Sequence, residues 1–316
     1  MPNLLSSLRT ACGALPLLAL LACDRAPNAT TPPTANGAAP VETPIETKAE
    51  HVVAANTAAA EYLYFLLPPA RAAAVPEQVG AYSTLPFGEQ GWENVARLAR
   101  YSADPVLAAH ADLVVAHAWQ EAETANLLKE RGVPVLVLPS ANGWDDIARN
   151  LRTLGKVLHV EKAAEKEILR RGNVVERLAH EATKRAKLRA LVYSNDGNGG
   201  FAAAKDTTAD AVLRMAGLRN AAAEAGLVGH AQVDLDRLLV LDPDVLVLAS
   251  PPKGVETSTT LTTLEASTAA KGLRALKEKK FVFVPDALLT SDSITMVDAA
   301  DLLATKVDDL LAGRKP

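Results

Sequence analysis

The strongest constraint on the fold is an alternation of short, uninterrupted apolar runs with amphipathic stretches. The apolar runs, which we predict to be strands, are 52–55, 72–75, 113–116, 133–138, 190–193, 245–249 and 281–284. Amphipathic stretches, which we predict to be helices, lie between them at 120–131, 144–154 and 208–216. Short apolar strands separated by helices are typical of parallel sheets that helices cover on both faces. The sequence therefore predicts the α/β class.

One region interrupts this alternation. Residues 156–188 contain no strand signal and no proline, and Gly172 is their only glycine. They are rich in Glu, Lys, Arg, Ala and Leu, and a continuous helix rising ~1.5 Å per residue would reach ~45 Å here. We therefore predict two lobes with parallel-type sheets flanked by helices, at 50–155 and 189–316, bridged by one long rigid helix at 156–188.

The segment that begins at Asp104 is repeated without a gap from Asp236. In each copy an Asp opens a short helix, a turn follows, and a second Asp (Asp112 or Asp244) leads directly into a buried strand. Chance could account for the apolar matches, because Leu and Val are common residues. The paired acidic residues favour one structural unit that is used once in each lobe.

The N-terminus predicts export. Residues 1–22 contain one early positive charge, Arg9, and a short apolar core that ends in a small residue. This is the layout of a secretory signal, and the core is too short to span a bilayer. The run ends in Leu-Leu-Ala-Cys at Cys23, which resembles the lipobox of bacterial lipoproteins, where the Cys carries the lipid anchor. The alternatives are an ordinary signal or a buried apolar segment with a chance Cys.

Residues 23–49 are rich in Pro, Thr and Ala, which predicts a disordered tether between the anchor and a folded body. A disordered tail without a role is the alternative. We expect the protein on the periplasmic or cell-surface side, held at a membrane by lipid. Asp24 follows the Cys, and in enterobacterial lipoproteins this residue favours retention at the inner membrane.

Charge and motifs argue against several function classes. The formal net charge is −4 and no basic run is present, which argues against a nucleic-acid partner. No GxSxG elbow occurs, and the six His residues lack HExxH or paired-ligand spacing, so we predict no enzyme, no metal site and no cofactor. A zinc- or manganese-binding relative would need several His and carboxylates in its cleft. His117, Glu61 and Asp292 are candidates for such a set, but nothing in their spacing along the chain supports it.

In open parallel sheets, ligands bind beyond the carboxyl ends of the strands, and the strand ends of two facing lobes would line one cleft. Residues that follow the predicted strands are therefore our candidates for ligand binding. They are Asn56, Tyr82, His117, Trp119, Gln120, Asn142 and Trp144 in the first lobe, and Ser194, Asn195, Gly200, Phe201, Ser250, Asp292 and Ser293 in the second.

Aromatic residues are rare, at 4% of the chain, yet all three tryptophans fall in the first lobe. Trp and Tyr offer flat faces with a polar handle, which suits a planar ligand. Trp119 and Trp144 could instead cap the core at helix starts. His117 or Tyr82 could ligate iron or cobalt, although a lone His at a strand end is more often a hydrogen-bonding residue. The Gly-rich segment 194–201 fits neither GxGxxG nor a Walker loop, and it predicts close approach to a ligand or a plain turn.

Six segments resemble, in their order and spacing, the periplasmic binding proteins of ABC importers for vitamin B12, haem and ferric siderophores. They are VVAANTAAAEYLYFL, DPVLAAHADLVV, KERGVPVLVL, RMAGLRNAAAEAG, DRLLVLDPDVLVL and GLRALKEKKFVFVPDA. The resemblance covers about residues 51–312. It implies a monomeric substrate-binding lipoprotein that captures a small metal chelate between two lobes and delivers it to an ABC permease dimer in the inner membrane.

The resemblance also implies a docking role for one acidic residue at a helix start in each lobe. Asp104 and Asp236 match these positions, with Asp in place of the Glu of relatives, and each could instead be an N-cap. Siderophore binders commonly place Arg in the cleft, whereas the strand-end loops here carry almost no cation except Lys253. This favours a corrinoid or another large neutral ligand. The alternative function is a lipoprotein of the same fold with a sensory, scaffold or enzymatic role.

Overall fold

The computed structural model of the protein describes residues 49–197, 199–251 and 256–314. The predicted signal segment, Cys23, the tether up to residue 48 and Lys253 lie outside these residues. Among the helices that are described, none combines the length and the apolar character needed to cross a bilayer.

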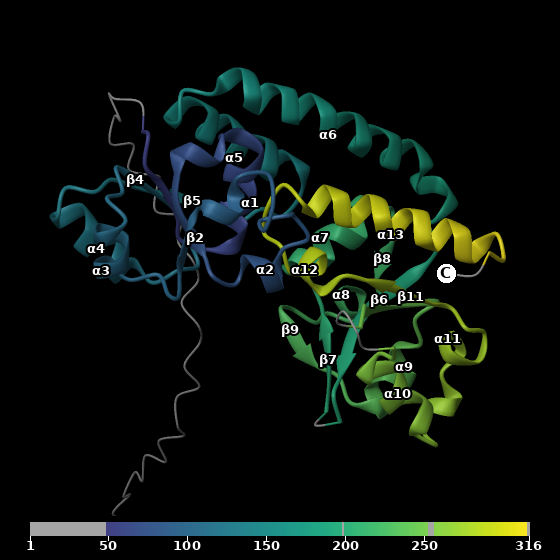
Figure 1. Cartoon of the computed structure of the whole chain (residues 1–316). Helices are drawn as coiled ribbons and strands as arrows, with labels where there is room; N and C mark the ends of the chain where they lie inside the picture. Colours follow the sequence, from purple (N-terminus) through teal and green to yellow (C-terminus); the bar gives the residue numbers. More distant parts are fainter. Residues whose placement is uncertain (1–48, 198, 252–255, 315–316) are drawn as a thin grey trace, which may run out of the picture. The chain divides into compact units, whose positions relative to one another are not determined.

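The first lobe is built on an all-parallel sheet, which has five strands within the described residues, in the order β3-β2-β1-β4-β5 (Figure 1). The strands are β1 (Val52–Ala54), β2 (Ala72–Pro76), β3 (Ala96–Leu98), β4 (Leu113–His117) and β5 (Val135–Leu138). The helices are α1 (Thr57–Leu66), α2 (Val79–Tyr82), α3 (Ala103–Ala108), α4 (Ala122–Glu130) and α5 (Trp144–Val157). Every residue of β1 and β4 is buried, as expected for strands that are covered on both faces.

The second lobe has a mixed sheet. Within the described chain it follows the order β11-β10-β6-β7-β9, and β8 pairs with β6. The strands are β6 (Arg189–Asn195), β7 (Gly200–Ala203), β8 (Arg219–Asn220), β9 (His230–Gln232), β10 (Val245–Ala249) and β11 (Phe281–Val284). The helices are α7 (Thr208–Met215), α8 (Ala221–Glu224), α9 (Leu235–Leu241), α10 (Thr259–Ala266), α11 (Arg274–Lys277), α12 (Asp286–Leu289) and α13 (Met296–Leu311). Strands β6, β8, β10 and β11 pair in parallel, whereas β7 pairs antiparallel with both β6 and β9.

The seven strands predicted from the sequence all form, and the α/β class is confirmed. The structure adds strands that lack an apolar run. β3 has two exposed residues out of three, and β8 is only two residues long. β7 and β9 form the antiparallel extension of the sheet, and their sequences, GFAA and HAQ, contain no run of large apolar residues.

The long predicted helix is shorter than expected. Helix α5 ends at Val157, and α6 (Glu161–Glu181) begins after a sharp turn at which His159 has a left-handed φ of 54°. Gly155 permits the turn, because a Cβ at this position would lie 2.8 Å from the Cβ of Ala164. Helix α6 has 21 residues and spans about 31 Å. A short 3-10 turn, Ala182–Lys184, then leads into β6.

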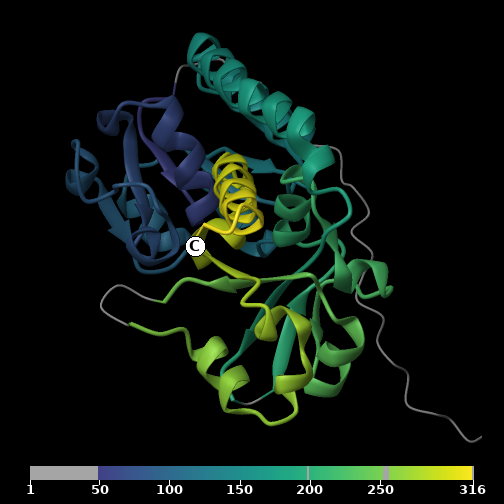
Figure 2. The same cartoon turned by 90° about the vertical axis from the view of Figure 1, so that its right-hand side faces the viewer.

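The second-lobe helix α13 packs beside α6, as both Figure 1 and Figure 2 show. One apolar core continues from Leu63 and Leu154 in the first lobe to Val245 and Leu303 in the second. Buried Arg171 of α6 strengthens this junction. Its guanidinium donates to the carbonyl of Ile294 at 3.2 Å and pairs with Asp298 at 2.8 Å and Glu167 at 2.5 Å. Packing and ion pairs therefore hold the lobes together in addition to the connecting helix.

The repeated acidic unit has the same structural role in both lobes. The carboxylate of Asp112 accepts hydrogen bonds from the main-chain N–H groups of Glu50 and His51 at 2.7 and 3.0 Å, just before β1. The carboxylate of Asp244 accepts the N–H of Arg189 at 2.8 Å, at the start of β6. In each lobe the Asp before one strand thus sets the start of the neighbouring parallel strand.

Candidate functional site

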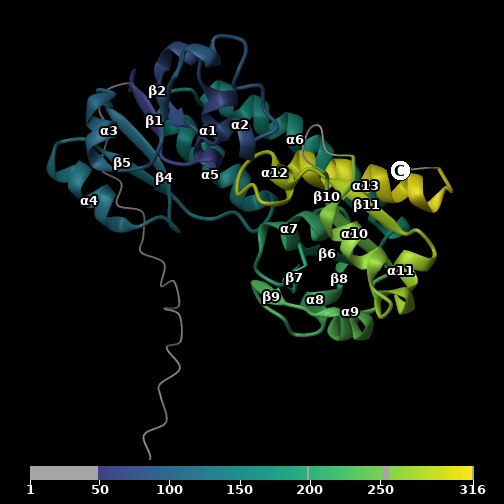
Figure 3. The ribbon, with the colours of Figure 1, turned by 60° about the horizontal axis from the view of Figure 1, so that its bottom comes forward.

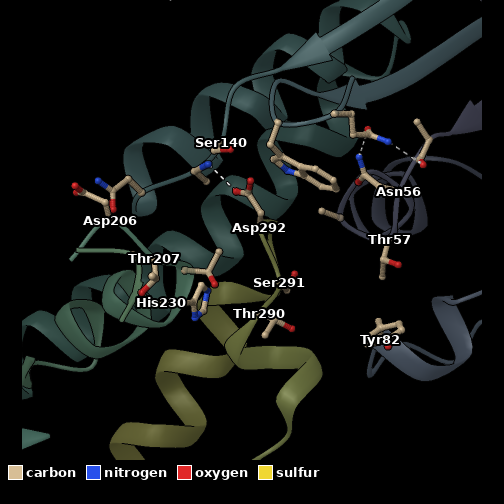
Figure 4. A pocket seen from close by; sticks show the side chains of 18 of the residues that line it. Asn56, Thr57, Tyr82, Ser140, Asp206, Thr207, His230, Thr290, Ser291 and Asp292 are labelled. Atoms are coloured by element: carbon tan, nitrogen blue, oxygen red, sulfur yellow. Dashed lines mark hydrogen bonds between the residues drawn. The ribbon is translucent and has the colours of Figure 1, made fainter. Parts of the chain in front are cut away.

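A cavity of about 930 Å³ lies at the carboxyl edge of the first-lobe sheet. Its first-lobe wall consists of Ala55, Asn56, Thr57, Ala58, Gln78, Tyr82, Trp119, Gln120, Ser140, Ala141 and Asn142. Its second-lobe wall consists of Asp206, Thr207, Thr208, Gly229, His230, Thr290, Ser291 and Asp292. Helix α12 contacts both α2 and α7, so the segment that follows α12 reaches the cavity from between the lobes (Figure 3). Figure 4 shows the labelled side chains of both walls around the same space.

Two amides join the ends of β1 and β4 at the cavity. Asn56 is the N-cap of α1, and its Oδ1 accepts the N–H of Ala59 at 2.8 Å. The Nδ2 of Asn56 donates to Oε1 of Gln120, while Nε2 of Gln120 donates to the carbonyl of Ala55 at 3.2 Å. The same Oε1 accepts the N–H of His117 at 3.1 Å. Because these amides hold each other, the polar part of the first-lobe wall is preorganised.

The aromatic side chains at the cavity are unusually exposed. Trp119 is 59% exposed and Tyr82 is 56% exposed, so both offer apolar faces to the cavity. The Trp119 ring stacks on His117 with 6.1 Å between ring centroids, and His117 stacks on buried Tyr62 at 6.3 Å. A column of three rings therefore runs from the cavity into the core, with Trp119 at its accessible end.

His117 lies underneath the cavity lining and does not form part of it. Its side chain is 1% exposed, and neither ring nitrogen has a hydrogen-bond partner among the described residues. Burial lowers the pKa of His117 to about 4, and the nearby main chain of Asp292 opposes this shift only in part. His117 is therefore a neutral imidazole covered by Trp119. The sequence-based hypothesis that it ligates a metal in the cleft has no support in this position.

Asp292 reaches from the second lobe to the first-lobe wall. It is 8% exposed, and its Oδ1 accepts the N–H of Ala141 at 2.7 Å. Burial raises the pKa of Asp292 to about 6. The N–H of Ala141 and the side-chain donors of Ser140 and Trp119 act in the opposite direction, and the charge of Asp146 raises the pKa further. Burial thus lets the carboxyl of Asp292 keep its proton to a higher pH than an exposed aspartic acid, with a pKa of about 6.

Glu61 forms the reciprocal contact from the first lobe. This fully buried carboxylate on α1 accepts hydrogen bonds from the hydroxyl of Ser83 at 2.6 Å and from those of Ser291, Ser293 and Thr295. The last three belong to the segment between α12 and α13. Each lobe thus provides one carboxylate that accepts hydrogen bonds from the other lobe.

The charged groups of the lining are acidic. Asp206 and Asp292 contribute carboxylates, and none of the described lining residues is Lys or Arg. Arg214 approaches from outside the lining. Its guanidinium donates to the carbonyl and Oδ1 of Asn142 at 3.0 and 2.7 Å and pairs with Asp210 at 3.2 Å. Its donors are thus directed at neighbouring residues. In the described chain, no three His, Cys, Asp or Glu residues are grouped so that they could hold a metal ion.

Several sequence-predicted site residues line the cavity: Asn56, Tyr82, Trp119, Gln120, Asn142 and Asp292. The others lie elsewhere: His117, Trp144, Ser194, Asn195, Gly200, Phe201, Ser250 and Ser293. Trp144 begins α5 and lines a separate groove of about 560 Å³ together with basic residues of that helix. Ser250 follows β10 and is half-buried, and Ser293 is buried against Glu61.

The hairpin of β6 and β7 explains most of the misplaced second-lobe residues. Ser194 and Asn195 still belong to β6, where they pair with Phe201 and Gly200 of antiparallel β7. Asn195 is buried and donates to the hydroxyl of Tyr193 at 3.2 Å. Gly200 is needed for packing, because a Cβ there would lie 1.8 Å from the same hydroxyl. Where the structure describes it, the Gly-rich segment thus contributes residues to two paired strands, and Gly200 leaves room for the side chain of Tyr193.

The lining residues that sequence reasoning missed include Gln78, Asp206, Thr207, Thr208, Gly229, His230 and Thr290. One local signal could have located part of this set. Thr207 is the N-cap of α7, and its Oγ1 accepts the N–H of Asp210 at 3.1 Å. His230 and Gly229 lie at the start of β9, for which the apolar pattern gives no indication.

Asp104 and Asp236 each lie exposed in the first turn of a short helix, α3 in the first lobe and α9 in the second. Neither residue is the N-cap. Ser102 holds that position in α3, and in α9 the side chain of Asp234 accepts the N–H of Arg237 at 2.9 Å. The alternative that these two residues serve as N-caps is therefore wrong, and both carboxylates are exposed to solvent.

Comparisons with known proteins agree with this architecture. No curated protein sequence gives a significant match. Among solved structures, the periplasmic heme-binding protein RhuT from Roseiflexus sp. RS-1 is similar at 17% identity and a TM-score of 0.67, covering 83% of this chain and 98% of that one. The heme-binding protein HutB of Vibrio cholerae has 16% identity and a TM-score of 0.69, with 82% and 98% covered.

The vitamin B12 binding protein BtuF of Vibrio cholerae is similar at 16% identity and a TM-score of 0.66, with 84% of this chain and 98% of that one covered. At such identities these structures share the fold. The sequence model of the family described as periplasmic binding protein matches residues 67–288, which is more than half of the chain. The chain therefore belongs to the periplasmic binding protein family.

Proposed function

We propose that the protein is the substrate-binding component of an ABC importer, and that it captures a metal chelate in the cavity without transforming it. The observation that carries this proposal is a cavity of about 930 Å³ with two exposed aromatic side chains and a rim of amides and hydroxyls. Ligand sites generally combine apolar faces with a few fixed polar groups. Similar structures include proteins described as binding heme and vitamin B12.

Within this class, the lining favours a large ligand that carries little negative charge. Asp206 and Asp292 would repel an anionic ferric chelate, and no Lys or Arg of the described lining is present to pair with one. A corrinoid could instead place a flat face against Trp119 and its amide groups against Asn56 and Gln120. A neutral corrinoid is therefore our preferred ligand, ahead of haem and of ferric siderophores.

Delivery to the membrane is the second part of the proposal. The exposed carboxylates of Asp104 and Asp236, one on each lobe, would dock onto arginines of a permease dimer. Cys23 would carry the lipid that keeps the monomeric protein at the outer face of the inner membrane, with residues 23–49 as a tether. Lipid attachment at this residue agrees with a family that acts outside the cytoplasm.

A tryptophan-fluorescence titration with cyanocobalamin, hemin and a ferric tris-catecholate tests the ligand class. We expect saturable quenching by cyanocobalamin, because Trp119 lies exposed at the cavity. The variant Trp119→Phe should lose most of this signal, whereas Trp92→Phe, a change in the first-lobe core, should retain it. Tight binding of the tris-catecholate without binding of cyanocobalamin would reverse the ligand ranking. An import role would be contradicted if none of the three chelates binds and native mass spectrometry of the purified protein finds no co-purifying ligand.

A further inference from the structure

Asn142 is a residue of the first-lobe cavity wall whose side chain is held by the second lobe. The guanidinium of Arg214 on α7 donates to the main-chain carbonyl of Asn142 at 3.0 Å and to its Oδ1 at 2.7 Å. Because a guanidinium can only donate, Arg214 fixes which end of this amide is occupied. The Nδ2 of Asn142 has no hydrogen-bond partner among the residues that the structure describes, so its two N–H groups are left for a molecule in the cavity.

Arg214 is itself anchored within the second lobe. Its guanidinium, although 48% exposed, pairs at 3.2 Å with the carboxylate of Asp210, a residue that is only 5% exposed. The other oxygen of Asp210 accepts Nδ2 of Asn220 at 2.9 Å, and the main-chain N–H of Asp210 donates to the hydroxyl of Thr207 at 3.1 Å. Since this carboxylate is buried and held in place, it restrains the guanidinium in the orientation that reaches Asn142.

The other two amides of the first-lobe wall have the same polarity. The side-chain oxygens of Asn56 and Gln120 both accept N–H groups of the first lobe, and that of Gln120 accepts two. An amide nitrogen carries two N–H groups, and Asn56 and Gln120 each use one of them within the first lobe. All three amides therefore engage their oxygens with the protein and keep at least one N–H free. Across the cavity, Asp206 provides a carboxylate that accepts hydrogen bonds (Figure 4).

We propose that Arg214 is a positioning residue for ligand binding, which orients the amide of Asn142 so that the first-lobe wall binds carbonyl oxygens of carboxamide groups at the edge of the ligand. A cation on the amide oxygen also polarises the amide and strengthens its N–H donors. Carboxamides suit both walls, since their oxygens accept from Asn142 and their N–H groups donate to Asp206. This inference rests on the proposed capture of a corrinoid and names the groups of that ligand which the cavity recognises.

Titrations with cyanocobalamin test the proposal with two substitutions. Asn142→Asp keeps the tie to Arg214 as an ion pair but removes both N–H donors, so we expect about tenfold weaker binding with unchanged urea stability. Arg214→Leu releases the amide and should weaken binding about fivefold, and Arg214→Lys should recover part of this loss. Arg219→Leu removes a similarly exposed second-lobe arginine, which pairs with Glu224, and should leave the affinity unchanged.

NMR of the side-chain amides in the ligand-free protein separates this inference from the proposed function. The N–H signals of Asn142 are assigned by their loss in Asn142→Asp. They should move toward the position of a solvated asparagine in Arg214→Leu and stay in place in Arg219→Leu. Wild-type affinity in folded Asn142→Asp, or signals that do not move in Arg214→Leu, would overturn the inference while import stands. If the wild-type protein binds none of the chelates, the proposed function fails and this inference fails with it, even where the amide signals move.

Discussion

The two walls of the cavity are built in different ways. The first-lobe wall follows the ends of parallel strands β1, β4 and β5, and its amides and aromatic rings are held by hydrogen bonds and stacking. The second-lobe wall comes from the turn before α7, the start of β9 and the segment after α12. The rule that ligands bind beyond strand ends thus locates residues on an all-parallel sheet. It fails for β6, whose end continues into an antiparallel hairpin.

The largest expected effect concerns docking to a permease, for which each lobe would provide one exposed carboxylate. Reversing both exposed charges, Asp104→Lys with Asp236→Lys, should abolish uptake of the ligand by cells while leaving its affinity for the purified protein unchanged. Close charge pairs at an interface contribute strongly to recognition, and reversed charges repel. Uptake assays and binding titrations measure the two quantities. Glu123→Lys with Glu265→Lys reverses one exposed charge on each lobe away from these helices and is the control. Unchanged uptake in the first double variant would disprove docking through these residues.

Removing the first-lobe carboxylate should strongly destabilise the junction of the two walls. Glu61→Ala leaves the hydroxyls of Ser291, Ser293 and Thr295 without their buried acceptor and should cost about 3 kcal/mol of unfolding free energy. Urea denaturation monitored by circular dichroism measures this loss. Thr295→Val removes a single hydroxyl and should cost about 1 kcal/mol. A loss below 1 kcal/mol for Glu61→Ala would show that packing alone fixes the segment.

Two neighbouring buried groups should have opposite effects on stability as pH falls. The folded-state pKa of Asp292 is raised to about 6, so its stabilising contribution is fully present below its ordinary value of 3.8 and is lost as pH rises through 6. The folded-state pKa of His117 is lowered to about 4, so its contribution is present above 6.5 and is lost as pH falls through 4. The two contributions therefore oppose each other between pH 6 and 4.

Single variants should expose these contributions. Relative to wild type, Asp292→Asn should lose about 2 kcal/mol more unfolding free energy between pH 7 and pH 4, because the contribution of His117 is then unopposed. His117→Phe should lose less than wild type over the same range. Urea midpoints at several pH values measure the differences. Parallel curves for wild type and both variants would show that neither group titrates as its burial implies.

The smallest effects concern the unequal contributions of the two walls to affinity. Trp119→Ala should weaken ligand binding about tenfold, because exposed aromatic anchors supply much of the binding free energy. Thr208→Ala in the second-lobe wall should change affinity about twofold, since Thr208 already donates to the carbonyl of Leu289 at 2.9 Å. Isothermal titration calorimetry measures both. Equal losses would show that the second-lobe wall is as specific as the first.

The sequence predicted site residues correctly where they directly follow a strand of the parallel sheet. Asn56, Trp119, Gln120 and Asn142 each follow an apolar run, and the carboxyl end of a parallel strand lies at the sheet edge that faces the ligand. It did not locate His230, because β9 has no apolar alternation, nor the antiparallel direction of β7. It also placed His117 in the cleft, whereas the last residue of β4 points into the core beneath Trp119.

By itself, the sequence determined the α/β class, the two sheets and the repeated Asp112–Asp244 unit, because these depend on local apolar periodicity and short-range turns. Only the tertiary structure decided which side chains meet. Glu61 accepts hydrogen bonds from Ser291 and Ser293, which are 230 and 232 residues away along the chain. Asp292 accepts one from Ala141, at a separation of 151 residues. Contacts over such separations depend on how the lobes pack, and no pattern along the chain records that packing.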